Sequence, residues 1–186
     1  GTDIGVLYET LAHEGYPGHL YFFNYVKQQG WHPINFFVSN IGFEEGWAEY
    51  AARLSLDSWG LDPDMMEVIF LDQEFSYLLM GLSDIGINYG GWTVDDVYDL
   101  WETYFYLDSA EDVRDVYDAC MAEPGTILSY SIGYYQICDL EEEVKEMLGE
   151  SFDHNEFVTE LLSVGGASFD ITRSYIMEWA NEKLHG

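Results

Sequence analysis

Two histidines and a glutamate near the start of the chain carry side chains that can bind a metal ion and activate water. They lie in the segment Leu11–His19, which reads LAHEGYPGH. In the familiar H-E-x-x-H arrangement, two histidines four residues apart share one helix face, and the glutamate is the general base. Here Pro17 stands at the fourth position after His13, and the second histidine is His19. Six residues of regular helix would leave the imidazoles about 120° apart, too divergent for one ion.

Proline and glycine between the histidines predict a departure from regular helix. Pro17 lacks the N–H that would bond the carbonyl of His13, and it disfavours the α conformation at the residue before it. Gly15 and Gly18 permit unusual dihedral angles on either side. We therefore expect a break or bulge that swings His19 back beside His13. A continuous straight helix with diverging imidazoles would rule out a shared ion.

An acidic segment follows one helix length later. It is Phe43–Tyr50, FEEGWAEY, in which Glu45 and Glu49 lie one turn apart on the same helix face. Catalytic zinc takes imidazole nitrogens and carboxylate oxygens, with three protein ligands and a water. The two segments together predict a metal site, and Glu49 suits the role of orienting a ligand imidazole. The alternative is a hydrogen-bonded His/Glu cluster without metal.

These motifs together resemble the bacterial DUF885 family, which is similar to gluzincin-type zinc metallopeptidases, including the peptidyl-dipeptidase group. The strings are H-E-x-x-P-G-H at 13–19, E-G-W-A-x-Y at 45–50, and P-G at 124–125 followed by Y-x-x-G at 130–133. The resemblance runs from about Leu7 to Phe169. Full-length members are much longer, so it implies that this chain is the C-terminal, site-bearing part of a longer protein.

The resemblance also implies roles for individual residues. The zinc ligands it implies are His13, His19 and Glu45. Glu14 would be the general base, and the Tyr130 hydroxyl would stabilise the oxyanion of the tetrahedral intermediate. Tyr134, one turn beyond Tyr130, is a second candidate for this position, and the alternative for both is an aromatic core pair.

A further segment resembles the family with one departure. Residues 84–88 read DIGIN and are followed by Trp92, and the family usually has a histidine at the position of Asn88. Any proton transfer by that histidine therefore does not carry over to this chain. Asn88 still donates and accepts hydrogen bonds, so we expect a binding role. Arg173 is expected to form a structural salt bridge, and His154 is expected at the surface or in a loop.

Composition limits the class of protein and of partner. The 186 residues are 48% hydrophobic and 17% aromatic, which predicts one ordered domain over residues 1–186. Only 6 Lys and Arg are present, and the formal net charge is −29. This charge disfavours nucleic acids and anionic membranes as partners, because both need a basic footprint. No apolar run reaches the ~18 residues of a membrane span.

Two cysteines and the chain ends say little about compartment. Cys120 and Cys138 lack metal-site spacing, and they either pair or remain free. The chain opens at Gly1 without Met or signal peptide, so we expect an excised segment. Many family members resemble exported or lipid-anchored proteins, and the resemblance therefore implies an extracytoplasmic location.

Helical periodicity recurs along the chain, and no stretch alternates with period two, so the fold is expected to be an irregular all-α multi-helix bundle. By the resemblance it is similar to the C-terminal half of a gluzincin or peptidyl-dipeptidase-like metallopeptidase. The expected helices are 4–29 with a break near 17, 43–59, 62–88, one capped by Thr93, one capped by Ser109, one from 125 to 149, 153–164, and a last one capped by Asp170 and ending near 184. A minor β element near 31–40 is also allowed.

The expected function is zinc-dependent hydrolysis of a peptide bond, with a peptide or small amide as substrate. A non-catalytic module that binds a peptide or protein partner on the same fold is the alternative. Hydrolysis of a non-peptide amide or ester by the same site is a third possibility.

Overall fold

The computed structural model describes residues 4–30, 34, 38, 40–56, 58, 60 and 62–185. This part of the chain contains helices and no strand, so the all-α prediction is confirmed. The α-helices are α1 (Ile4–Glu14), α2 (His19–Gln28), α3 (Ile41–Leu56), α4 (Pro63–Asn88), α5 (Val94–Trp101), α6 (Arg114–Ala122), α7 (Thr126–Leu148), α8 (His154–Val164) and α9 (Phe169–His185). Short 3₁₀ helices are η2 (Ala110–Val113) and η3 (Gly149–Ser151). The allowed β element near 31–40 lies mostly outside the described residues.

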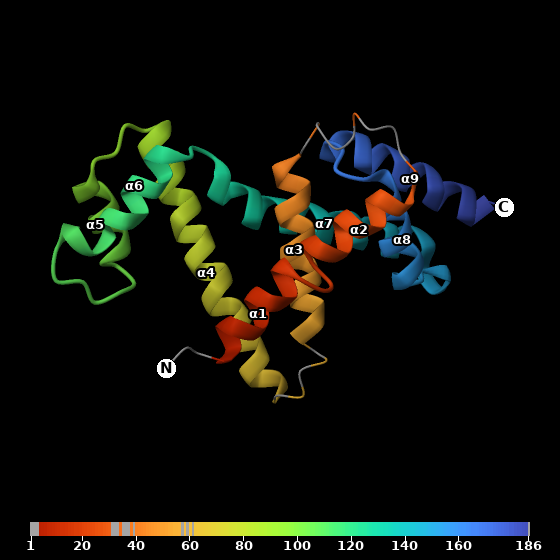
Figure 1. The fold of residues 1–186 in the computed structure, drawn as a ribbon, viewed down its shortest axis with the longest axis horizontal. Helices are drawn as coiled ribbons and strands as arrows, with labels where there is room; N and C mark the ends of the chain where they lie inside the picture. The colour runs from red at the N-terminus through yellow and green to blue at the C-terminus, as the bar shows by residue number, and fades with distance from the viewer. Residues whose placement is uncertain are drawn as a thin grey trace.

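Helices α3 and α7 pack against each other at the centre of the molecule (Figure 1). α1 also packs on α3. α8 and α9 lie together at the C-terminal end, where α9 packs on α7. α4 leads away from the centre and carries α5 and α6 at its far end (Figure 1). The motifs that predict a metal site, on α1, α2 and α3, therefore lie near the centre of the fold.

The hydrophobic core is divided along this architecture. The main cluster joins α2, α3, α7, α8 and α9, and it includes Phe22, Phe43, Trp47, Ile137, Val144, Phe157, Leu161 and Ile176. A separate cluster joins the far end of α4 to α5, η2 and α6, through Ile87, Val97, Val113 and Cys120. Both cysteines are free: Cys120 lies in this second cluster, whereas Cys138 packs on the first.

Glycines allow α3 and α7 to approach at backbone distance. A Cβ added to Gly46 would lie 2.3 Å from the carbonyl carbon of Gly133, and one added to Gly133 would lie 2.0 Å from the carbonyl oxygen of Gly42. Real Cβ atoms do not come this close to backbone atoms. The two helices therefore approach closely through glycines.

Most helix starts follow the predicted caps. The Asp62 side chain accepts the Asp64 N–H with Pro63 at the first helical position, and Thr93 forms a reciprocal capping box with Asp96. Ser109 caps η2. Asp153 accepts the N–H of residue 156 at the start of α8.

Two local predictions need correction. The second helix runs Ile41–Leu56 and not 43–59. The last helix begins at Phe169, so Asp170 lies inside its first turn and is not its cap. Glu141 is buried, and its carboxylate lies 3.2 Å from Nζ of Lys145 and 2.9 Å from Nδ1 of His154. His154 is the first residue of α8, and its side chain is 38% exposed, in agreement with the expected surface position.

Arg173 forms the structural salt bridge that was expected, with its Nη2 2.5 Å from Oε2 of Glu143. None of the described helices combines the length and hydropathy needed to cross a bilayer.

Candidate metal centre

The predicted break between the two histidines is present. α1 ends at Glu14, four residues form bends, and α2 begins at His19. Two backbone hydrogen bonds across this junction join residues six positions apart, whereas those of an α-helix join residues four positions apart. The Gly18 N–H donates to Ala12 O at 2.9 Å, and the Tyr21 N–H donates to Gly15 O at 3.3 Å. Two residues are thus looped out of the helical register.

This bulge explains how a six-residue spacing can serve as a four-residue one. Removing two residues from the register leaves His19 in effect four helical positions after His13, about 40° away around the axis. The two rings accordingly lie 4.7 Å apart between centroids and nearly perpendicular, at 89°. The expectation that His19 returns beside His13 is confirmed.

Gly18 makes the bulge possible. A Cβ on Gly18 would lie 1.8 Å from the carbonyl oxygen of His13, so no other residue fits there. The Trp47 indole N–H donates to the Gly18 carbonyl at 3.4 Å and ties the bulge to α3.

Three side chains from α1, α2 and α3 converge on one point. Oε2 of Glu45 lies 3.3 Å from Nε2 of His13 and 3.2 Å from Nε2 of His19. The three candidate ligand atoms all lie within 4.8 Å of one another. Zinc–nitrogen and zinc–oxygen bonds of about 2.0–2.1 Å in a tetrahedron place ligand atoms about 3.3 Å apart. The donor set and its spacing therefore fit zinc.

A carboxylate stands behind one of the imidazoles. Nδ1 of His13 lies 3.0 Å from Oε1 of Glu49, and Glu49 is 5% exposed. Such a carboxylate fixes which ring nitrogen is free to bind a metal. The predicted orienting position of Glu49 agrees with this contact. Nδ1 of His19 is buried and has no hydrogen-bond partner among the described residues.

The electrostatics of the cluster favour a positive charge at its centre. Burial alone would lower the pKa of His13, but hydrogen bonds to Glu45 and Glu49 and their charges outweigh it and raise the pKa to about 9. Burial alone would raise the pKa of Glu45, but the two histidines lower it to about 2. A proton or a divalent cation satisfies this preference, and metal binding requires the proton to leave.

Tyr130 of α7 covers the cluster. Its ring stacks on His13 with 5.8 Å between centroids and 11° between planes. Burial, together with the charge of Glu45 and a hydrogen bond to it, raises the pKa of Tyr130 to about 12, so its hydroxyl keeps its proton at neutral pH and can donate it in a hydrogen bond. Glu14 follows His13 directly, is exposed, and is close enough for its charge to act on Tyr130.

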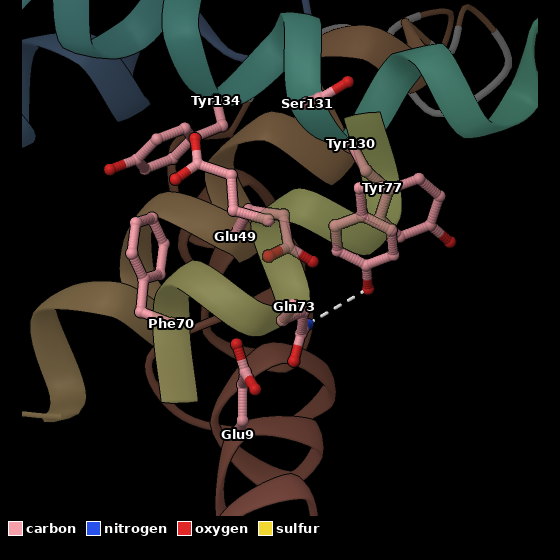
Figure 2. A pocket seen from close by; sticks show the side chains of 9 residues that line it. Glu9, Glu49, Phe70, Gln73, Tyr77, Tyr130, Ser131 and Tyr134 are labelled. Carbon is pink, nitrogen blue, oxygen red and sulfur yellow. Dashed lines mark hydrogen bonds between the residues drawn. The ribbon is translucent and has the colours of Figure 1, made fainter. Parts of the chain in front are cut away.

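A pocket adjoins the cluster on the side of Glu49 and Tyr130, and Figure 2 shows it between α1, α3, α4 and α7. Its lining residues are Glu9, Glu49, Phe70, Gln73, Glu74, Tyr77, Tyr130, Ser131 and Tyr134. Tyr134 thus lies beside Tyr130 at this pocket, and its ring also packs on Phe70 at 5.6 Å.

Sequence reasoning missed Glu9 and the α4 residues of the pocket. Glu9 lies one helical turn before His13, a spacing that could have identified it. Burial and the charge of Glu49 raise the pKa of Glu9 to about 7. Gln73 and Tyr77 carry no motif, and only the packing of α4 reveals them. The Gln73 amide donates to the Tyr77 hydroxyl at 3.1 Å.

Asn88 is placed away from the cluster. Its amide donates to Asp84 Oδ1 at 2.7 Å and to the Cys120 carbonyl at 3.0 Å, where the far end of α4 meets α6. These bonds tie helices together. The structure does not bring Asn88 to the residues predicted around the metal.

Comparisons with known proteins agree with the fold. A model of the family described as "Bacterial protein of unknown function (DUF885)" matches residues 6–176. A search of the curated proteins finds no match. A solved structure, "The crystal structure of the putative lipoprotein from Colwellia psychrerythraea", is similar with a TM-score of 0.79 and 24% identity over 94% of this chain. The match covers 30% of that chain, so this chain spans less than a third of its neighbour's length.

Proposed function

We propose that this chain, which belongs to the DUF885 family of bacterial proteins, holds one zinc ion and hydrolyses peptide bonds. His13, His19 and Glu45 are the proposed ligands. The observation that carries the proposal is their convergence, with one carboxylate oxygen 3.2–3.3 Å from two imidazole nitrogens. Peptides or small amides are the proposed substrates, by resemblance to gluzincin-type peptidases.

The reaction assigns a task to each side chain around the ligands. When bound, zinc supplies Lewis acidity that makes water nucleophilic at neutral pH and polarises a carbonyl. Glu14, exposed and next to His13, takes the proton of the attacking water and passes it to the leaving amine. Tyr130 donates a hydrogen bond to the oxyanion. Glu49 holds the His13 ring in the orientation that leaves Nε2 free.

Three glutamate variants test the proposal, with zinc content and peptide hydrolysis measured on each protein. Glu14→Gln should keep one zinc and lose about 10²–10⁴-fold in kcat, because only the base is removed. Glu45→Gln should lose the zinc. Glu44→Gln, at the neighbouring position outside the cluster, is the matched control and should keep the zinc and the hydrolysis rate of the parent protein.

The outcomes separate the proposed activity from its alternative. Protein that takes up no zinc would contradict the metal site. Protein that takes up zinc but cleaves no member of a peptide library would favour a peptide- or partner-binding module on this fold. A library that includes amides and esters tests the breadth of the reaction in the same experiment.

We also propose an extracytoplasmic location for the whole protein. The support is the description of the structural neighbour as a lipoprotein. Fractionation of cells that express the full-length protein tests it, and recovery in the cytoplasm would contradict it.

A further inference from the structure

The pocket beside the metal centre contains a buried carboxylate with an unpartnered oxygen. Glu9 is 3% exposed, and its Oε2 has no hydrogen-bond partner among the described residues. In Figure 2 the Glu9 side chain points from α1 toward Gln73 of α4. Burying a carboxylate without a partner is costly, so proteins almost always pair such groups. The pocket therefore lacks a positively charged or donating group that complements Glu9.

The residues around Glu9 do not supply that group. Glu49 and Glu74 also line the pocket, and the lining contains no Lys, Arg or His. Arg53, a cation whose charge acts on Glu9, is paired with Glu67 and lies over the Phe70 ring at 4.2 Å. Glu49 is paired with His13 and Glu74 with Tyr135. Oε1 of Glu49 likewise makes no hydrogen bond, but it lies 3.0 Å from Nδ1 of His13, whereas Glu9 has no ion pair among the described residues.

We propose that this pocket binds the alkylammonium group of a peptide substrate, either its α-amino group or a lysine side chain, next to the scissile bond. This inference rests on the proposed function, because the pocket shares Glu49 and Tyr130 with the metal centre. A substrate at the proposed metal centre would thus be anchored by its positive charge.

Chemistry and size both suit an ammonium group. An ammonium carries three donors, and the pocket offers the Glu9 carboxylate and the oxygens of Gln73 and Tyr77 as acceptors. The Tyr77 and Tyr130 rings, 5.2 Å apart, add π-faces that attract cations. The pocket has room for about one water-sized group, which matches an ammonium head and not a longer peptide segment.

The kinetic test uses peptide pairs that differ only in charge. One pair has a free or an acetylated amino terminus, and the other has lysine or norleucine next to the scissile bond. In one of the two pairs, kcat/KM for the ammonium peptide should be at least about tenfold higher than for its neutral partner, mainly because KM is lower. The pair that shows this difference identifies which amino group the pocket binds. Glu9→Gln should bring this ratio close to one. Glu178→Gln, an exposed glutamate on α9, should leave it unchanged.

A binding measurement keeps the test independent of turnover. Calorimetry with n-butylammonium, with n-butanol as its neutral match, should show binding of the cation that weakens about tenfold or more in Glu9→Gln. Gln73→Lys, which places an ammonium inside the pocket, should abolish it. Binding without hydrolysis would support the pocket and contradict the peptidase. The inference would be overturned if hydrolysis did not depend on substrate charge or if butylammonium did not bind. It would also be overturned if the chain bound a second metal ion that is lost in Glu9→Gln.

Discussion

Two glutamates on neighbouring helices show how surroundings divide one side-chain type into two roles. The histidines lower the pKa of Glu45 to about 2, whereas burial and Glu49 raise the pKa of Glu9 to about 7. Glu45 is therefore a carboxylate near neutral pH, as its proposed role as a metal ligand requires. Glu9 is in place to exchange a proton or to take a cation near neutrality.

The raised pKa of Glu9 predicts a pH-dependent stability. Because the folded pKa of about 7 exceeds the ordinary 4.5, the contribution of Glu9 is fully present below 4.5 and is lost as pH rises through 7. Glu9→Gln mimics the neutral acid, so it should raise the free energy of unfolding at about pH 8, by up to about 3 kcal/mol, and leave it nearly unchanged at about pH 5. The charged groups that act on Glu9 are Glu49, His13 and Arg53.

Urea unfolding in the presence of EDTA at both pH values measures this effect. The chelator prevents differences in metal content from entering the comparison. A variant that is no more stable than the parent at about pH 8 would show that Glu9 has a partner after all.

At the scale of elements, the junction of α1 and α2 decides whether the histidines meet. Gly18→Ala would place a Cβ 1.8 Å from the His13 carbonyl oxygen. The bulge must then open, so we expect loss of zinc and destabilisation of more than about 3 kcal/mol. Gly166→Ala is the matched control, because its Cβ would make only ordinary contacts of 3.5 Å or more. Zinc titration and urea unfolding measure both variants, and normal zinc binding by Gly18→Ala would contradict the role of the bulge.

The contact between α3 and α7 predicts a different phenotype. Gly133→Ala would place a Cβ 2.0 Å from the Gly42 carbonyl oxygen and force the helices apart. The proposed metal ligands lie on α1, α2 and α3, whereas Tyr130 lies on α7. We therefore expect zinc to be retained, kcat to fall, and stability to drop by about 1–3 kcal/mol. Loss of zinc with kcat per bound ion unchanged would show that α7 supports the ligands and not the reaction.

At the scale of the whole molecule, net charge opposes compactness. The formal charge of −29 over 186 residues produces self-repulsion that dissolved salt screens. The thermal unfolding midpoint should rise between about 10 mM and about 150 mM NaCl, over which the Debye length falls from about 30 Å to 8 Å. Potassium chloride at equal ionic strength should act alike, and an effect confined to one salt would point to specific ion binding instead.

The chain by itself determined the helical class, most helix starts and the identity of the proposed ligands. These depend on contacts between residues a few positions apart, such as Thr93 with Asp96, or on motifs such as His13 to His19. It also predicted that proline and glycine would break the first helix, because their backbone limits are local. It could not state the size of the break, or where the Glu45 carboxylate lies relative to the two histidines.

Only the tertiary structure decided which distant side chains meet. The bulge restores the register of His19 with His13, and the close approach of α3 and α7 through Gly46 and Gly133 brings Tyr130 over His13. The Glu9 pocket arises where α1, α3, α4 and α7 pack, and Asn88 is drawn to another part of the fold. The physical reason is that local propensities act over one or two turns, whereas burial and pairing depend on helices far apart in sequence.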